Sequence, residues 1–295
     1  MHAPPRLLTT PVNSIALPGL LLLTGLALVG IQLDLSALLN PAATLSGPAT
    51  VTIAPADFTY RLDGSVLRDG REVDAPLVQA RLAEPLTIMQ FQVSQADYAR
   101  CVAEGTCAAA QNSGNGDIPV TGVNYDDATR YAAWLSENTG QSWTLPTSEE
   151  WNFAAGEKVT DTATSVVDDD ANPALRWLAD YEAEAARKTA GGRFPQPLGS
   201  FGTNAHGLAD IAGNVWEWTQ TCHRRVRVDT AGTILSKTQA CSIRLLEGQH
   251  RAPMSVFVRD AKSGGCSVGV PPANLGFRLV RRPSWTERLL APFHS

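Results

Sequence analysis

The stretch that decides the fold is residues 207–219, which read GLADIAGNVWEWT. Asp210 and Glu217 place two carboxylates seven positions apart, and Gly213 gives the chain between them freedom to curl. Main-chain carbonyls of Gly213 and Val215 can then join these carboxylates around one cation. Hard oxygen ligands of mixed origin are those that calcium prefers. The alternative interpretation is an aromatic turn in a core, with Glu217 in a salt bridge, because the stretch has no EF-hand pattern.

Three further segments occur in a fixed order around this stretch. They are residues 119–124 (PVTGVN), residues 145–151 (LPTSEEW) and residues 274–278 (NLGFR). Together the four motifs resemble those of the formylglycine-generating-enzyme, or sulfatase-modifying-factor, family, and the resemblance covers roughly residues 50–282. It implies an α+β fold, a loop-rich variant of the C-type lectin fold with short strands and few helices.

The same resemblance assigns a structural calcium ion to the first motif. The positions that match the family's ligands are Asp210, Gly213, Val215 and Glu217. Asp210 replaces an asparagine of the family enzyme, and an added negative charge is compatible with calcium.

The amino terminus predicts export. Residues 15–33 form an uncharged apolar run, long enough for a tilted membrane span or for a signal-peptide core. We therefore predict a signal peptide or membrane anchor over residues 1–33, a linker over 34–50, the sulfatase-modifying-factor domain over 51–282 and a tail over 283–295. The expected location is periplasmic or otherwise extracytoplasmic, with residues 15–33 as a tether to the inner membrane.

Periodicity indicates a few regular elements within the domain. Alternation predicts strands at residues 51–53, 58–62 and 86–93, the last followed by a short helix capped by Ser94. A helix is predicted from Tyr125 to Gly140, with one buried face made by Ala128, Tyr131, Ala132 and Leu135. Another begins at Thr147, which forms a capping box with Glu150.

The chain has five cysteines, an odd number. Cys101 and Cys107 flank a short loop after a helix, and we predict a disulfide between them in an oxidising compartment. Of the remaining Cys222, Cys241 and Cys266, at most two can pair within the chain. One thiol is then left for metal binding, chemistry or burial.

The resemblance places the family's chemistry in a cysteine pair that binds copper and oxidises a substrate cysteine to formylglycine. An ungapped alignment puts His250 and Ser255 at those two positions. Formylglycine formation by the known route is therefore not expected, although a gap would move Cys241 or Cys266 towards the pocket. By position, the candidates for lining this pocket are His250, Ser255, Arg259 and Cys266, and no catalytic role is assigned to them.

Residues 241–281 also resemble the NirV-type branch of the family, which is encoded beside nitrite-reductase genes. The supporting residues are 247–251 (EGQHR), 258–261 (VRDA) and 264–269 (GGCSVG). This resemblance implies an accessory role in denitrification, with the nitrite reductase system as partner. Cys222, Cys241, His250 and Cys266, with His223 adjacent, have the ligand types of a copper or zinc site.

Composition and motifs exclude several other classes. A net charge of -5 gives no case for nucleic-acid binding. The sequence has neither a G-x-S-x-G nucleophile elbow nor an H-E-x-x-H zinc helix. Three hypotheses remain: a partner-binding module, a divergent metal- or thiol-dependent oxidoreductase, and a copper delivery protein. The missing cysteine pair favours the first.

Overall fold

The structure is a computed structural model, and it describes residues 45–112, 114, 116–159, 194–231, 233–259 and 275–284, with residues 175, 178, 182 and 287. All of these belong to one compact unit, Leu45–Ser295. The predicted anchor at 15–33 lies outside the described residues, as does most of the linker and of the tail, so these domain boundaries stay predictions. No helix in the described part of the chain has the length and apolarity needed to span a membrane.

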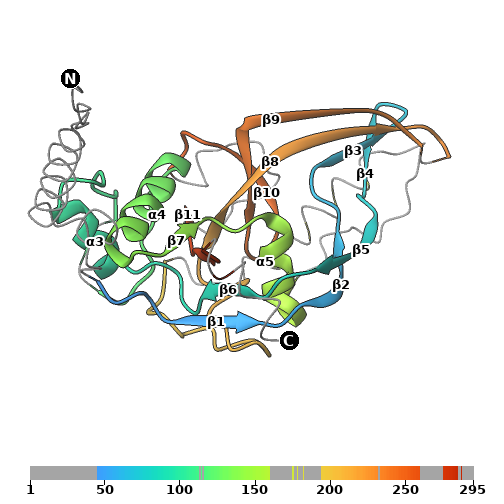
Figure 1. Cartoon of the computed structure of the whole chain (residues 1–295). Helices are drawn as coiled ribbons and strands as arrows, with labels where there is room; N and C mark the ends of the chain where they lie inside the picture. The colour runs from blue at the N-terminus through green and yellow to red at the C-terminus, as the bar shows by residue number, and fades with distance from the viewer. Residues whose placement is uncertain are drawn as a thin grey trace, which may run out of the picture. The chain divides into compact units, whose positions relative to one another are not determined.

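Short strands outnumber helices (Figure 1). The helices are α3 (Gln95–Ala103), α4 (Tyr125–Thr139), α5 (Ser148–Ala155) and the 3-10 turn η1 (Gly156–Lys158). The strands are β1 (Thr50–Ile53), β2 (Ala56–Arg61), β3 (Ser65–Arg68), β4 (Arg71–Val73), β5 (Leu77–Leu82), β6 (Leu86–Met89), β7 (Ser142–Thr144), β8 (Trp216–Val228), β9 (Ile234–Glu247), β10 (Ala252–Ser255), β11 (Leu275–Gly276) and β12 (Val280–Arg282). The predicted loop-rich α+β class is confirmed.

The strands form separate small sheets. One sheet has the order β1-β6-β12-β7, and a second has the order β10-β9-β8-β3-β4, with β11 parallel to the start of β8. Strands β2 and β5 pair alone. The long antiparallel hairpin of β8 and β9 is the largest element, and Figure 1 shows it extending over the top of the molecule.

The helix starts follow the predicted caps. Ser94 accepts from the amide of Asp97 at the start of α3, and the predicted box at α5 forms between Thr147 and Glu150. Helix α4 begins with a second box, between Asn124 and Asp127, and ends at Gly140 in the left-handed conformation. The predicted strand 86–93 is shorter than expected. It ends at Met89 as β6, and the amide of the next residue, Gln90, donates to the carbonyl of Ala49.

Three apolar clusters of buried residues lie in the described part of the chain, and the two larger ones join most of these elements. The larger packs the predicted face of α4 against Trp216, Trp218 and Phe277, and all four predicted residues of that face are buried. The other packs Ile88, Trp151 and Leu208. The motif residues 215–218 therefore lie in the core, where the two tryptophans are almost fully buried.

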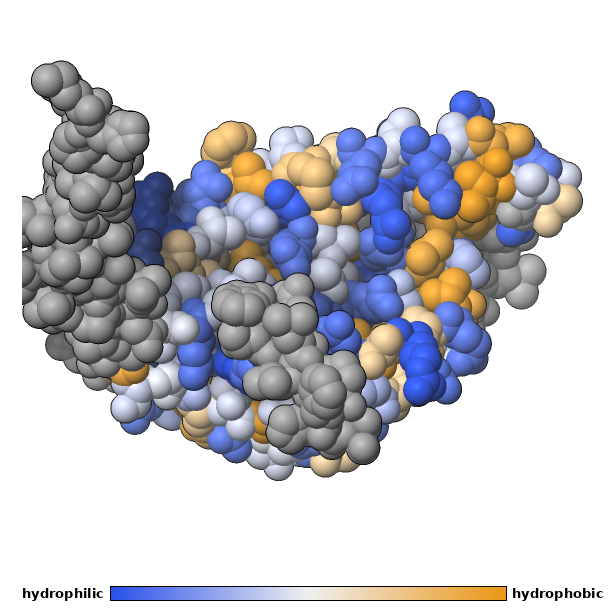
Figure 2. All heavy atoms as spheres, viewed as in Figure 1, coloured by the Kyte–Doolittle hydropathy of each residue, from blue (hydrophilic) through white to orange (hydrophobic). Residues whose placement is uncertain are grey.

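The described surface is mixed in character. On the face shown in Figure 2, apolar residues form small groups among hydrophilic ones. Single exposed side chains such as Leu77 and Leu235 are ordinary for a folded protein.

Candidate functional site

The turn that precedes β8 carries unusual backbone angles. Asp210, Ala212 and Asn214 have φ of 56°, 59° and 58°, in the left-handed region that non-glycine residues seldom adopt. Gly213, which the sequence analysis expected to supply this freedom, has no positive φ. A Cβ at Gly213 would lie 3.1 Å from Cβ of Phe201, so a larger residue there would require Phe201 to shift by a few tenths of an ångström.

The turn delivers Glu217 into a fully buried ion pair with Arg278. The guanidinium donates from Nε to Oε2 at 2.7 Å and from Nη2 to Oε1 at 2.8 Å. Trp151 Nε1 donates to Oε2 at 2.8 Å, and Gln92 Nε2 donates to Oε1 at 2.9 Å. A carboxylate accepts about four hydrogen bonds, and those of Glu217 are therefore all used.

Arg278 is satisfied as completely as its partner. Besides Glu217, it donates to the carbonyls of Met89, Gln90 and Ala209 at 3.0 to 3.3 Å. The guanidinium has five N–H groups, and each has an acceptor. The pair joins the loop after β6, the turn before β8 and the end of the NLGFR motif.

Asp210 is also occupied by N–H donors. Its Oδ2 accepts from the amide of Gly199 at 2.6 Å and its Oδ1 from the amide of Phe201 at 2.8 Å. The two carboxylates thus accept from different donors, while Gln92 Nε2 links the residues because it also donates to the main-chain carbonyl of Asp210 at 3.3 Å. Among the described residues, the cation paired with Glu217 is Arg278. With their carboxylate oxygens occupied by N–H groups, Asp210 and Glu217 do not fit the calcium ion predicted for Asp210, Gly213, Val215 and Glu217. Calcium needs unoccupied oxygen ligands that converge on one point.

A cavity of about 280 Å³ lies next to this network, at the end of β9. Its lining includes Tyr60, Asn152, Glu247, Gly248, His250 and Arg251. A Cβ at Gly248 would lie only 2.1 Å from Cδ1 of Trp216, so a glycine is required where the chain passes the motif tryptophan. The cavity therefore depends on the same motif as the core.

Glu247 is the buried acid of this cavity. It accepts from Arg251 Nε at 2.6 Å, from Asn152 Nδ2 at 3.1 Å and from the Ser148 hydroxyl. Burial raises the pKa of Glu247, and Arg251 and the hydrogen bonds oppose that shift only in part. Arg251 is itself fixed, because its Nη1 donates to the carbonyls of Arg61 and Leu62 at 2.9 and 3.2 Å.

His250 is positioned by Trp216. The two ring centroids are 4.8 Å apart in an edge contact, and the indole Nε1 donates to the main-chain carbonyl of His250 at 3.0 Å. Burial also raises the pKa of Tyr60, which lines the same cavity. The wall of the cavity thus combines these polar groups and one imidazole with apolar side chains such as Leu77 and Val159.

Two of the other predicted pocket residues, Ser255 and Arg259, do not line the cavity with His250. Ser255 ends β10, where it pairs with Ile243, and it does not line the cavity. Arg259 forms an ion pair with Asp127 of α4 at 3.1 Å. Cys266 lies outside the described residues.

The structure pairs four of the cysteines. Cys101 and Cys107 form the disulfide that the sequence predicts. Cys222 and Cys241 form a second disulfide, which corrects the predicted copper or zinc site, because bonded sulfurs are not thiolate ligands. Among the described residues, no group of three or more histidine, cysteine or acidic side chains is arranged to hold a metal ion.

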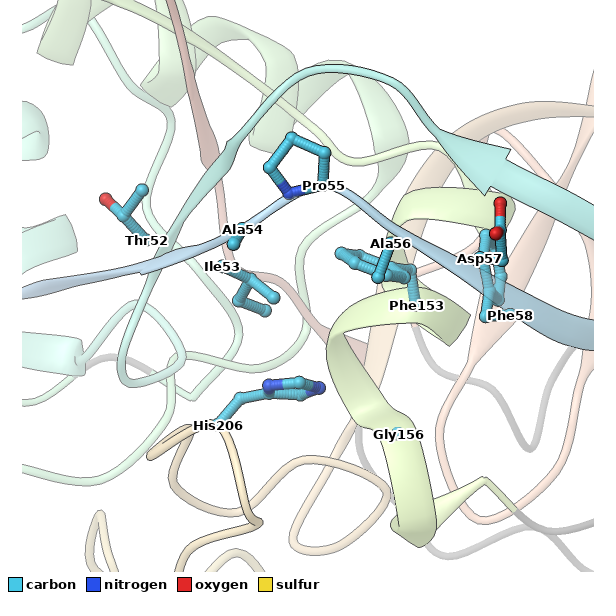
Figure 3. Close-up of a pocket in the computed structure, with 10 residues that line it drawn as sticks. All are labelled: Thr52, Ile53, Ala54, Pro55, Ala56, Asp57, Phe58, Phe153, Gly156 and His206. Carbon is cyan, nitrogen blue, oxygen red and sulfur yellow. The ribbon is translucent and has the colours of Figure 1, made fainter. Parts of the chain in front are cut away.

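A second cavity, of about 470 Å³, was not predicted (Figure 3). Its aromatic wall comprises Phe58 and Phe153, in edge contact with centroids 5.0 Å apart, and His206, whose ring lies 6.2 Å from that of Phe153. Gly156 lines both cavities, at the end of α5. No motif marks these residues, which the fold brings together from three segments.

Comparison with known proteins identifies the fold. A family model described as "Sulfatase-modifying factor enzyme 1-like domain" matches residues 35–283. The structure of PvdO from Pseudomonas aeruginosa superposes with a TM-score of 0.51 at 21% identity, and the match covers 80% of this chain and 95% of that one. The predicted resemblance is confirmed at the level of family and fold.

Curated relatives match over shorter stretches. A formylglycine-generating enzyme of Mycobacterium tuberculosis is 36% identical over 115 residues, 35% of this chain and 33% of the relative. An inactive C-alpha-formylglycine-generating enzyme 2 of Bos taurus is 29% identical over 176 residues, 56% of this chain and 50% of the relative. The chain thus spans a third to a half of the length of these relatives.

Proposed function

The chain belongs to the family of sulfatase-modifying factor enzyme 1-like domains, and from this premise we propose that it is an exported accessory module that binds a protein partner and does not generate formylglycine. The supporting observation is the cavity beside β9. At the position of the first family cysteine stands His250, which lines the cavity with Glu247 and Arg251. A thiolate pair is what selects Cu(I), and an imidazole with a distant hydroxyl is no substitute for it.

The properties of the cavity support binding. Glu247 and Arg251 hold each other in place, so their polar groups are fixed before a partner arrives. A preorganised wall lowers the entropic cost of association. A polar side chain from a partner's loop is the kind of group that fits a cavity of about 280 Å³ with such a wall.

The proposed partner belongs to the nitrite reductase system. The support is the resemblance of residues 247–251 to the NirV-type branch, since Glu247, Gly248, His250 and Arg251 of this segment line the cavity. The name of the Bos taurus relative, an inactive enzyme, gives a precedent in the family for a domain without the activity.

Export is part of the same proposal. Two disulfides are typical of an oxidising compartment, and the apolar run at residues 15–33 supplies the means of export or anchoring. The copper-dependent alternatives lose support, because Cys222 and Cys241 are bonded to each other.

Binding of the purified full chain to a copper nitrite reductase, measured by calorimetry, tests the proposal. We expect His250→Ala to weaken binding by about tenfold or more, the loss typical of a residue central to an interface. His206→Ala, in the second cavity, is the matched control and should bind like the wild type. Equal loss in both variants, or no binding by the wild type, would contradict the proposal.

A further inference from the structure

The disulfide between Cys222 and Cys241 has one buried and one exposed end. It crosses the β8–β9 hairpin (Figure 1) with a Cα–Cα distance of 4.5 Å, where the strand pairing shifts on either side of Cys222. Cys222 is 7% exposed, whereas Cys241 lies on the exposed part of β9. Cys241 is therefore the end of the bond that is more accessible to a thiolate from solvent.

A cation is directed at the buried sulfur. Arg244 Nη1 lies 2.9 Å from Cys222 Sγ and also donates to the carbonyl of Gln220. The guanidinium carbon lies 4.5 Å above the centre of the Tyr125 ring. Arg244 is partly buried, and its Nε has no hydrogen-bond partner. Within the described part of the chain no carboxylate pairs with it.

Arg244 is the cross-strand neighbour of Cys222, and its contacts with the Gln220 carbonyl and the Tyr125 ring hold its guanidinium beside the sulfur. A neutral disulfide sulfur is a weak acceptor and gains little from a guanidinium. A thiolate at the same position gains a charge-assisted contact, and a nearby arginine lowers the pKa of a thiol. The arginine therefore favours the state in which Cys222 carries a negative charge, which is the state formed when the bond breaks.

We propose that Cys222 and Cys241 form a thiol–disulfide exchange site that oxidises an exposed dithiol of another protein. A thiolate of the substrate attacks Cys241 Sγ, the bond between Cys241 and Cys222 breaks, and Cys222 leaves as a thiolate beside Arg244. The second substrate thiolate then attacks the mixed disulfide and releases Cys241. The substrate loses two electrons to become a disulfide, and the two protein sulfurs gain them and become thiols. The leaving-group stabilisation is what makes this direction fast.

The chain contains its own control. Cys101 is fully buried and Cys107 is 6% exposed, so a thiolate reaches neither sulfur without local opening. The proposal therefore predicts that a dithiol reduces the Cys222–Cys241 bond faster than the Cys101–Cys107 bond of the same folded chain. The site is independent of the proposed partner cavity, and its failure would leave that proposal standing.

The test is the rate at which a limiting dithiol, dithiothreitol, reduces the native full chain, followed by alkylation and peptide mapping. We expect Cys222 and Cys241 to be alkylated while Cys101 and Cys107 stay bonded. Arg244→Met should slow reduction of the Cys222–Cys241 bond on the order of tenfold, whereas Arg244→Lys, which keeps the charge, should retain most of the rate. Equal rates for both disulfides, or for wild type and Arg244→Met, would overturn the proposal.

Trapping with single-cysteine variants gives a second readout that does not depend on the arginine. Cys222→Ala leaves the exposed Cys241 as a free thiol, which should attack oxidised glutathione, form a mixed disulfide with one glutathione and release the other as a thiol. Cys241→Ala leaves only the buried Cys222, which should form none. Equal trapping by both variants would overturn the assignment of Cys241 as the attacked sulfur.

Discussion

Glu217 and Arg278 form a buried ion pair in the core of the domain. Both side chains are fully buried, and every polar atom of the pair is hydrogen-bonded. A buried charge is tolerated only when it is paired in this way. The arginine takes the place that the calcium hypothesis gave to a metal ion. The alternative interpretation of the motif, an aromatic turn with Glu217 in a salt bridge, describes the structure better.

Removing one member of this pair should be severely destabilising. Arg278→Met leaves an uncompensated buried carboxylate, and we expect a loss of about 3 to 5 kcal/mol in the free energy of unfolding. Arg281→Met removes an arginine from a partly exposed pair with Glu287 and should cost at most about 1 kcal/mol. Urea unfolding of both variants provides the measurement, and similar losses would contradict the account.

Calcium should leave the melting temperature of the protein unchanged. A ligand that binds only the folded state raises that temperature, and the occupied oxygens of Asp210 and Glu217 offer calcium no site. Scanning calorimetry with added calcium and with a chelator checks this. A calcium-dependent rise that Glu217→Gln abolishes would restore the site predicted from the sequence.

The buried Glu247 should make stability depend on pH. Its pKa is raised from 4.5 by burial, so the folded state holds its proton more tightly than the unfolded state. The corresponding stability is fully present below pH 4.5 and is lost as the pH rises through the folded-state pKa. Free energies of unfolding of the wild type and of Glu247→Gln, compared from pH 4 upwards, should diverge in this sense about that pKa. A difference that stays constant or grows in favour of the wild type would contradict the shift.

At the scale of elements, the sequence predicted what is local. The caps at Ser94 and Thr147 and the buried face of α4 depend on residues three or four positions apart, and all three are present. The end of β6 and the left-handed turn at 210–214 were not predicted, because both depend on distant partners such as Leu279 and Gly199. Sequence spacing does not record such contacts.

The Thr147 cap stabilises the start of helix α5, and α5 carries two residues that hydrogen-bond to Glu247 in the cavity, Ser148 and Asn152. Thr147→Ala removes the cap that accepts from the Glu150 amide at 3.0 Å, and should cost about 1 kcal/mol. Thr129→Ala, at an exposed site inside α4, is the matched control and should change stability by less than about 0.5 kcal/mol. Urea unfolding checks both values, and equal effects would refute the capping role.

At the scale of the whole molecule, the family and fold were predictable because four motifs retain their order. Of the candidate site, His250 lines a cavity with Glu247, Arg251 and Tyr60, which come from β9, the loop after it and β2. The aromatic cavity around Phe153 and His206 left no signal, since its residues meet only through the packing of separate segments. The second disulfide was one of several pairings open to three cysteines.

The central claim is that this domain keeps the sulfatase-modifying-factor fold without its formylglycine chemistry. The most direct test is to incubate the full chain with a sulfatase-type Cys-x-Pro-x-Arg peptide, copper and a reductant, and to weigh the peptide by mass spectrometry. We predict an unchanged mass, because His250 and Ser255 stand where the copper-binding thiolates would be needed. The mass loss of a thiol converted to an aldehyde, in a reaction abolished by Cys241→Ala, would contradict the account and return that cysteine to the catalytic site.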